Sequence, residues 1–262
     1  MKHNLLILAA ACLTLAGCFD NHNRPADVVT VTSLDALAAT NRAEVVRLLL
    51  RGSPKPVTDA DLKGLSESAL QQLDLSELGM DKIPETVWTL KGLTSLWFVR
   101  NKLAEIPAGV AQLPALTYLN LDGNAIASVP DTLSGAKSLR WLRLNENKVR
   151  ELPASLGALK DMRRIYLRRN LFTSVPDVVQ EWPELETLAL DDNAITELPA
   201  WLGVKMTKLK FLSLKGCPIS KLPEDLSGLK QLVALNLANC KLSSEEVKRI
   251  RTALGDKVAI TF

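Results

Sequence analysis

Histidine and cysteine, which often act as nucleophiles, bases or zinc ligands, are scarce in this chain of 262 residues. Its two histidines, His3 and His22, precede every segment with the pattern of a folded core. Without histidine in that core, serine–histidine–aspartate catalysis, cysteine–histidine catalysis and imidazole ligation of zinc are excluded. There is also no glycine-rich phosphate loop. We therefore expect a protein that is not an enzyme and that uses no cofactor and no metal.

Three aspartates, Asp122, Asp191 and Asp192, follow short apolar runs and are the remaining candidates for chemistry. Carboxylates alone can hydrolyse glycosides or bind calcium. We favour the simpler interpretation that these aspartates are charges solvated in loops.

Cys18 lies at the end of a sequence typical of a secretory signal: Lys2, an apolar run from Leu5 to Ala16, and small residues before the cysteine. The run would span about 18 Å as a helix, which is less than the ~30 Å of a membrane core, so cleavage is favoured over a spanning helix. Leu15-Ala16-Gly17-Cys18 resembles the lipobox of bacterial lipoproteins, and the alternative is ordinary cleavage near Gly17.

The lipobox resemblance implies several acyl chains on Cys18, and several chains anchor a protein to a membrane far more firmly than one. We expect residues 1–17 to be a signal peptide and residues 18–32 a lipidated tether. Phe19 stands where an aspartate would imply retention in the inner membrane, which favours the outer membrane of the cell envelope. The formal net charge of +3 falls to +2 without Lys2 and gives no indication of a nucleic-acid partner.

Between Leu70 and Leu242 the pattern L-x-x-L-x-L-x-x-N-x-L recurs eight times at intervals of 23 residues and one of 24, with methionine once at the first position and with Leu78, Cys217 and Cys240 at the ninth position of the end repeats. Alternation of apolar and polar residues in each repeat predicts a strand with one buried face. The longer interval places a one-residue insertion between Trp201 and Lys208. The repeats start at Leu70, Leu93, Leu116, Leu139, Met162, Leu185, Leu209 and Leu232.

Two further positions of the repeat have structural roles. An inward asparagine can both donate to and accept from the backbone of a tight turn. Proline fixes φ, lacks an N–H and suits the first turn of a short helical segment. The ninth position is Asn101, Asn124, Asn147, Asn170 and Asn193 in the middle five repeats, and an apolar residue precedes Pro84, Pro107, Pro130, Pro153, Pro176, Pro199 and Pro223.

These features resemble the leucine-rich repeat family, specifically its class of about 23 residues with an L-x-x-L-P ending, over Leu70–Leu242. The resemblance implies an α/β fold: a right-handed solenoid in the form of a curved horseshoe, with a parallel concave sheet and helical caps. Family members use that concave face to bind proteins or other large ligands. The fold does not indicate which ligand.

Solenoids need caps at their ends. Ser33 to Arg51 predicts a helix with Ser33 as N-cap and Gly52 as its stop, and a second helical stretch lies near Asp59 to Leu70. Residues 41–52 resemble one ankyrin helix, but only one copy is present, so we assign residues 33–69 to a helical N-terminal cap. Residues 243–262 are the expected C-terminal cap. They hold a capping-box spacing from Ser243 to Glu246 and a candidate final strand over residues 258–262.

Cys217 and Cys240 occupy the ninth position of adjacent repeats. Neighbouring strands are ~4.8 Å apart, so a disulfide is allowed in an exported protein. The interpretation we favour is two buried thiols that replace the asparagine, because stacked side chains run parallel and do not match the disulfide torsion.

The third, fifth and seventh positions of each repeat point out of the sheet, into the concave face. Aromatic and arginine side chains dominate interface energies, so their concentration in repeats two to five predicts a ligand-binding surface, although idle surface aromatics are the alternative. Arg140, Arg163 and Arg169 would add positive charge at its edges and favour an acidic or phosphate-bearing ligand. The predicted ligand-binding residues are Trp97, Tyr118, Trp141, Arg143, Arg164, Tyr166 and Arg168.

The sequence thus favours a membrane-anchored lipoprotein that binds a protein partner through the concave face of its repeats, with no nucleic acid involved. The alternative is a glycan-binding or lipopolysaccharide-binding envelope protein, since aromatic faces stack on sugars and arginines pair with phosphate. A carboxylate-dependent enzyme is a third candidate.

We predict that Cys18 is lipidated. Cys18→Ser should move the protein from the membrane fraction to the soluble fraction of cells, because the acyl chains are the expected anchor. Mass spectrometry of the wild type should show the acylated cysteine. A Cys18→Ser protein that stays with membranes, together with an unmodified wild type, would contradict the lipoprotein assignment.

Overall fold

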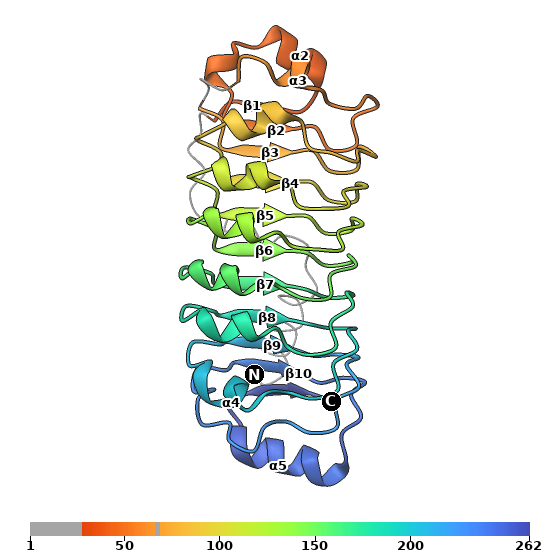
Figure 1. Cartoon of the computed structure of the whole chain (residues 1–262), viewed down its shortest axis with the longest axis vertical. Helices are drawn as coiled ribbons and strands as arrows, with labels where there is room; N and C mark the ends of the chain where they lie inside the picture. The colour runs from red at the N-terminus through yellow and green to blue at the C-terminus, as the bar shows by residue number, and fades with distance from the viewer. Residues whose placement is uncertain (1–27, 66–68) are drawn as a thin grey trace.

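The computed structural model describes residues 28–65 and 69–262, so the predicted signal peptide, Cys18 and most of the tether lie outside the described residues. The described chain winds into a ladder of parallel strands that form one open curved sheet, in the order in which they occur along the sequence (Figure 1). Each inner strand pairs with the strand one turn before it and the strand one turn after it. The horseshoe-shaped solenoid predicted from the repeats is confirmed.

Eight of the strands come from the eight predicted repeats, and each has the fourth position of its repeat at its centre. Their register is regular: Leu142 pairs with Leu119 on one side and Ile165 on the other. The strands are β3 (Gln72–Asp74), β4 (Ser95–Trp97), β5 (Tyr118–Asn120), β6 (Trp141–Arg143), β7 (Arg164–Tyr166), β8 (Thr187–Ala189), β9 (Phe211–Ser213) and β10 (Ala234–Asn236).

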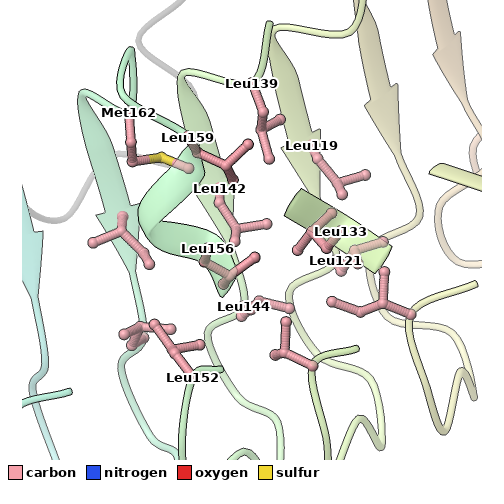
Figure 2. Close-up of a cluster of buried hydrophobic side chains, with 14 of the residues drawn as sticks. Leu119, Leu121, Leu133, Leu139, Leu142, Leu144, Leu152, Leu156, Leu159 and Met162 are labelled. Atoms are coloured by element: carbon pink, nitrogen blue, oxygen red, sulfur yellow. The ribbon is translucent and has the colours of Figure 1, made fainter. Parts of the chain in front are cut away.

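The core is a set of leucine columns that run through the solenoid. Figure 2 shows Leu119, Leu142 and Leu144 among leucines of neighbouring turns, and all three side chains are fully buried. Leu133 and Leu156 from the convex side close the same core from behind. Each turn therefore buries its apolar side chains against the next turn as well as within itself.

Short helical segments follow the prolines and form the convex side, as predicted. Five are 3-10 segments: Glu85–Thr89, Ala108–Gln112, Asp131–Gly135, Ala154–Ala158 and Asp177–Glu181. The turn with the extra residue forms instead the α-helix α4 (Ala200–Lys205), which shows where the insertion is absorbed. The residues directly after Pro223, 224–230, contain turns in place of a helical segment. Among the described residues, no helix has the length and apolar character needed to cross a membrane.

The ninth-position asparagines connect each turn to the turn before it. Asn147 Oδ1 accepts from the Ile126 amide at 3.0 Å, while Nδ2 donates to the carbonyls of Leu121 at 3.0 Å and Leu144 at 3.1 Å. Asn101, Asn170 and Asn193 repeat this arrangement. One side chain thus supplies both the donor and the acceptor that the buried turn requires, and the predicted role is confirmed.

Cys217 and Cys240 are free thiols at the same position. Their sulfurs donate to the carbonyls of Leu190 and Leu214, at 3.2 and 3.3 Å. Burial raises the pKa of Cys217 to about 11 and that of Cys240 to about 12. The thiols therefore stay protonated near neutral pH and replace the donor half of the asparagine.

The N-terminal region corrects one prediction. Ser33 does cap a helix, α2, but that helix covers only Leu34–Ala39. A 3-10 segment (Arg42–Glu44) and the strand β2 (Arg47–Leu49) follow, so the continuous helix over Ser33–Arg51 and its ankyrin-like second half are wrong.

The reason is that Val45, Leu48 and Leu50 have the spacing of the first, fourth and sixth repeat positions and are fully buried. They form a further turn that pairs with β3, and Gly52 occupies the left-handed conformation (φ 65°) that ends it. This turn is 25 residues long and lacks the ninth-position asparagine, so it does not match the pattern of the eight predicted repeats. The two-residue strand β1 (Thr30–Val31) pairs with β2, and α3 (Asp59–Leu62) is a single turn.

The C-terminal end is closed by the helix α5 (Ser244–Leu254) and the strand β11 (Ala259–Thr261), which pairs with β10 as expected. Ser243 Oγ accepts from the Glu246 amide at 3.1 Å. The Glu246 carboxylate accepts from the Leu222 amide at 2.8 Å and pairs with Arg249 at 2.7 Å. Glu246 therefore fastens the cap to the repeat before it, an extra role that the capping-box spacing does not indicate.

We predict that Leu142→Asp unfolds or strongly destabilises the protein, because it removes packing and places a carboxylate in a fully buried column. The expected loss is roughly 4 kcal/mol or more, measured by thermal or urea unfolding. The exposed neighbour Arg150 provides a control: Arg150→Ala should change stability by less than about 0.5 kcal/mol. Cooperative melting of Leu142→Asp at the wild-type temperature would contradict the assigned register.

Candidate ligand-binding surface

The register places the predicted ligand-binding residues on one surface. Tyr118, Trp141 and Arg164 are successive Cα partners along the third-position column. Trp97, Asn120, Arg143 and Tyr166 are successive partners along the fifth-position column. Arg168 follows β7 at the seventh position. Six of the seven predicted residues therefore lie on the consecutive strands β4 to β7, and Arg168 lies two residues beyond the end of β7. That they bind a ligand stays a prediction.

These residues form an aromatic–arginine cluster, a name used here for Trp97, Tyr118, Trp141, Arg143, Arg164, Tyr166 and Arg168. The Trp97 and Tyr118 ring centroids are 5.1 Å apart, and the Tyr118 and Trp141 rings meet edge to face at 5.6 Å. The cluster is therefore continuous across three strands, and its members are partly exposed.

Two arginines of the cluster lie over aromatic rings. The Arg164 guanidinium carbon is 4.4 Å from the Trp141 ring centroid, and that of Arg143 is 4.8 Å from the Tyr166 centroid. These cation–π contacts restrain long side chains that would otherwise be mobile, so less conformational entropy is lost when a ligand binds.

The contacts of Asp122 show that the expected role of this residue, a charge solvated in a loop, is wrong. Its carboxylate accepts from Arg143 Nε and Nη2, both at 2.8 Å, and from the Asn145 amide at 2.7 Å. The side chains of Arg143 and Asp122 are only 17% and 14% exposed. Burial works against the Arg143 charge, yet Asp122 and the neighbouring tyrosines keep the pKa of Arg143 above its ordinary value. Asp122 is therefore a structural counter-ion beneath the cluster.

Asp191 has the same role three turns further on. Its side chain is 6% exposed, its carboxylate lies 3.2 Å from Arg168 Nε, and it also accepts from the Ser213 hydroxyl. Asp192 is 40% exposed and lies 3.5 Å from Arg169, so of the three aspartates it alone resembles a loop charge. Among the described residues, no group of three or more histidine, cysteine or carboxylate side chains has a geometry suited to a metal ion.

The hydroxyl of Tyr118 lies within the cluster and accepts from Asn120 Nδ2 at 3.3 Å. Burial raises the pKa of Tyr118 above its ordinary value of 10.0. Tyr118 therefore stays neutral at physiological pH and contributes an apolar ring with a polar tip.

The structure also shows a row of charged residues at the rim of the concave face that was not predicted from the sequence. The eighth position has positive φ in every repeat, and where it is not glycine or asparagine it is charged: Glu77, Arg100, Glu146, Arg169 and Asp192. Arg100 pairs with Glu77 at 3.2 Å, and Arg169 pairs with Glu146 at 2.9 Å. Arg169 is therefore neutralised by its neighbours and does not add the free positive charge that we expected. Alternation of charge at this one position was the signal available in the sequence.

Beyond the cluster, the outward positions of β8 to β10 are mostly small, and Phe211 is the large side chain among them. Tyr166 and its partner on β8, Ala189, mark the change from large to small side chains. The aromatic–arginine cluster is thus limited to one part of the concave face.

A family model described as "Leucine rich repeat" matches residues 91–149 and 183–242. These two segments contain β4 to β6 and β8 to β10, with the leucine columns and asparagines described above. The chain carries leucine-rich repeats. No curated protein matches the sequence.

Solved leucine-rich-repeat structures have the same fold. An internalin from Listeria monocytogenes is 20% identical, with a TM-score of 0.70 over 88% of this chain and 64% of its own. A leucine-rich-repeat protein from Leptospira interrogans is 24% identical, with a TM-score of 0.56 over 90% of this chain and 70% of its own. The ectodomain of a receptor kinase from Arabidopsis thaliana is 26% identical, with a TM-score of 0.61 over 76% of this chain and 24% of its own. This chain thus spans less than two thirds of the internalin and about a quarter of the plant ectodomain.

We predict that Asp122→Ala destabilises the repeats by about 2 kcal/mol or more, because it removes hydrogen bonds to a half-buried guanidinium and to a main-chain amide. Glu146→Ala is the matched control, since it breaks an ion pair whose side chains are 61% and 52% exposed. That loss should stay below about 1 kcal/mol. Equal effects of the two variants on urea unfolding would show that Asp122 is not the counter-ion described here.

Proposed function

We propose that this leucine-rich-repeat protein is a binding protein, and not an enzyme, that holds a protein partner against the aromatic–arginine cluster. The observation that carries the proposal is the cluster itself: aromatic rings and guanidinium groups in mutual contact on the concave face. Such side chains supply most of the binding energy of protein interfaces, and here they are held in place before a partner arrives.

Complexes of similar proteins support a protein or peptide partner. The Arabidopsis receptor-kinase ectodomain was solved in complex with Casparian strip integrity factor 2. A second structure, 25% identical with a TM-score of 0.63, is a complex of the proteins PEPR1 and AtPEP1. This chain spans only 24% and 28% of those two chains, so they support the kind of partner and not its identity.

The geometry of the rings favours a protein over a glycan. Sugars stack on open aromatic faces, but Trp141 and Tyr166 each have a guanidinium over one ring face. Tyr118 contacts Trp97 on one side and Trp141 on the other. The surface therefore presents ring edges and N–H groups, and its mixture of apolar and cationic groups suits the side chains of a protein.

The membrane anchor is the second part of the proposal. The lipobox-like residues Leu15–Cys18 support attachment to the cell envelope, and Phe19 favours the outer membrane. The solenoid would then present its concave face to partners at a membrane surface.

We predict that Trp141→Ala and Tyr166→Ala each weaken partner binding at least roughly tenfold, because each removes a central aromatic anchor. The partner is first isolated by pull-down from envelope extract before and after removal of polysaccharide, and its Kd is then measured by calorimetry. Loss of the captured species with the polysaccharide would identify a glycan ligand instead.

Trp182→Ala is the matched control. Trp182 is 1% exposed on the convex side, and its indole N–H donates to the Leu156 carbonyl at 2.8 Å. Its truncation should cost roughly 3 kcal/mol or more of stability and leave the affinity of the folded protein unchanged. A Trp141→Ala/Tyr166→Ala protein that binds the partner as tightly as wild type would place the site elsewhere.

A further inference from the structure

Three arginines at the start of β6 and β7 carry positive charge that is not neutralised. Arg140 and Arg163 are exposed, and Arg164 is partly exposed beside them. The amides of Arg163 and Arg164 both donate to the Arg140 carbonyl, at 2.8 and 3.0 Å, so the three residues belong to adjacent turns. None of them forms an ion pair with a carboxylate in the described part of the chain.

The other arginines near the cluster differ in this respect. Arg143 pairs with Asp122, Arg168 with Asp191, and Arg169 with Glu146 and Asp192. Each of these three arginines thus has a counter-ion within the protein, whereas the arginines at the strand starts of β6 and β7 have none in the described residues. We refer to Arg140, Arg163 and Arg164 as the arginine corner.

Acidic residues on the next turn do not compensate for the corner. The hydrogen bond from Lys208 lowers the pKa of Glu184, and the charge of Arg163 makes a smaller contribution in the same direction. Glu186, which follows Arg163 in the second-position column, lies 3.2 Å from Lys210. Both carboxylates are therefore engaged with lysines, and the positive charge of the corner remains available to a ligand.

Arg164 is also held in a conformation suited to a carboxylate. Its guanidinium carbon lies over the Trp141 ring, 4.4 Å from the ring centroid. A guanidinium has five N–H donors and can form two parallel hydrogen bonds to a carboxylate, and no ion pair within the described residues occupies the donors of Arg164. The Trp141 indole also excludes water from one side of the Arg164 guanidinium, and lower exposure to water strengthens an ion pair that this group forms with a ligand.

We infer that the arginine corner binds an acidic segment of the protein partner, with a side-chain carboxylate on Arg164 and further carboxylates facing Arg140 and Arg163. The apolar part of the same segment lies on Trp141 and the rest of the aromatic–arginine cluster. This inference rests on the proposed function. The three cations are spread over two turns that are ~4.8 Å apart, which matches a row of carboxylates on a chain segment. The same charges would accelerate association and make it sensitive to salt.

A selection from a displayed library of random peptides on the full chain tests the inference. Peptides enriched by the wild-type protein should be rich in aspartate and glutamate and should also carry an aromatic or aliphatic residue. Synthetic copies of the enriched peptides should bind roughly tenfold or more weakly to Arg164→Gln, and weaker still to the variant with all three arginines replaced by glutamine. Arg164→Lys, which keeps the charge but loses the planar fork, should fall between wild type and Arg164→Gln.

Arg150→Gln is the matched control, because Arg150 is exposed in the same turn as Arg140 but lies beyond Asn147, outside the concave columns. It should bind the peptides within about twofold of wild type. The melting temperature of Arg150→Gln should match that of wild type, and the melting temperatures of the Arg164 variants should fall only slightly, since the corner makes no ion pair in the free protein and Arg164 loses only its partly exposed contact with Trp141.

The outcomes separate the two proposals. Enriched peptides without acidic residues, or acidic peptides that bind Arg164→Gln as well as wild type, would overturn the arginine corner and leave the protein-binding function intact. Displacement of the peptides by inorganic phosphate at concentrations at which free glutamate has no effect would overturn the choice of carboxylate. Failure to enrich any peptide would overturn the proposed function, and the corner with it.

Discussion

The leucines of one turn of this solenoid can be buried only by the turns on either side, and the rest of the structure depends on that packing. Leu119, Leu142 and Ile165 are register partners on successive strands, and all are fully buried. A turn of different length is accepted only if the extra backbone is absorbed away from the sheet. The 24-residue turn does this by forming α4 in place of a 3-10 segment, and the strands on either side keep their register.

Tight turns create a second requirement, because buried amides and carbonyls need partners where the chain leaves the sheet. The ninth-position asparagines meet it with one acceptor and one donor atom, each directed to the preceding turn. Cys217 and Cys240 retain only the donor, and they occur where the repeats approach α5. The seventh position extends the same principle to charged groups, since Asp122 and Asp191 each bind an arginine and a second polar group from neighbouring turns.

A regular core produces an irregular concave face, and function follows from that contrast. The inward positions are nearly invariant in type, whereas the outward positions change from aromatic and arginine residues on β4 to β7 to small residues on β8 to β10. The scaffold fixes Trp141 and Arg164 as neighbours one strand apart, which allows the guanidinium to stack on the indole. Arg143, Arg168 and Arg169 are each paired with a carboxylate within the protein. Arg140, Arg163 and Arg164, at the strand starts of β6 and β7, make no such pair in the described residues, and for that reason we propose them as the groups that bind a ligand.

By itself the sequence determined the period, the eight strands, the inward leucines, the place of the insertion and the columns that carry the aromatic–arginine cluster. Each of these depends on spacing along the chain, and periodic spacing reports directly which face of a strand is buried. Only the tertiary structure decided that residues 47–49 form a strand, because an apolar segment of that length fits a helix as well until β3 lies beside it. Tertiary structure likewise decided that Asp122 is a counter-ion, that Arg169 is neutralised and that Glu246 binds the Leu222 amide. The two partners in each of these contacts lie about one full turn apart in sequence. Which residues face one another across turns depends on the strand register, and the local sequence pattern alone does not specify that register.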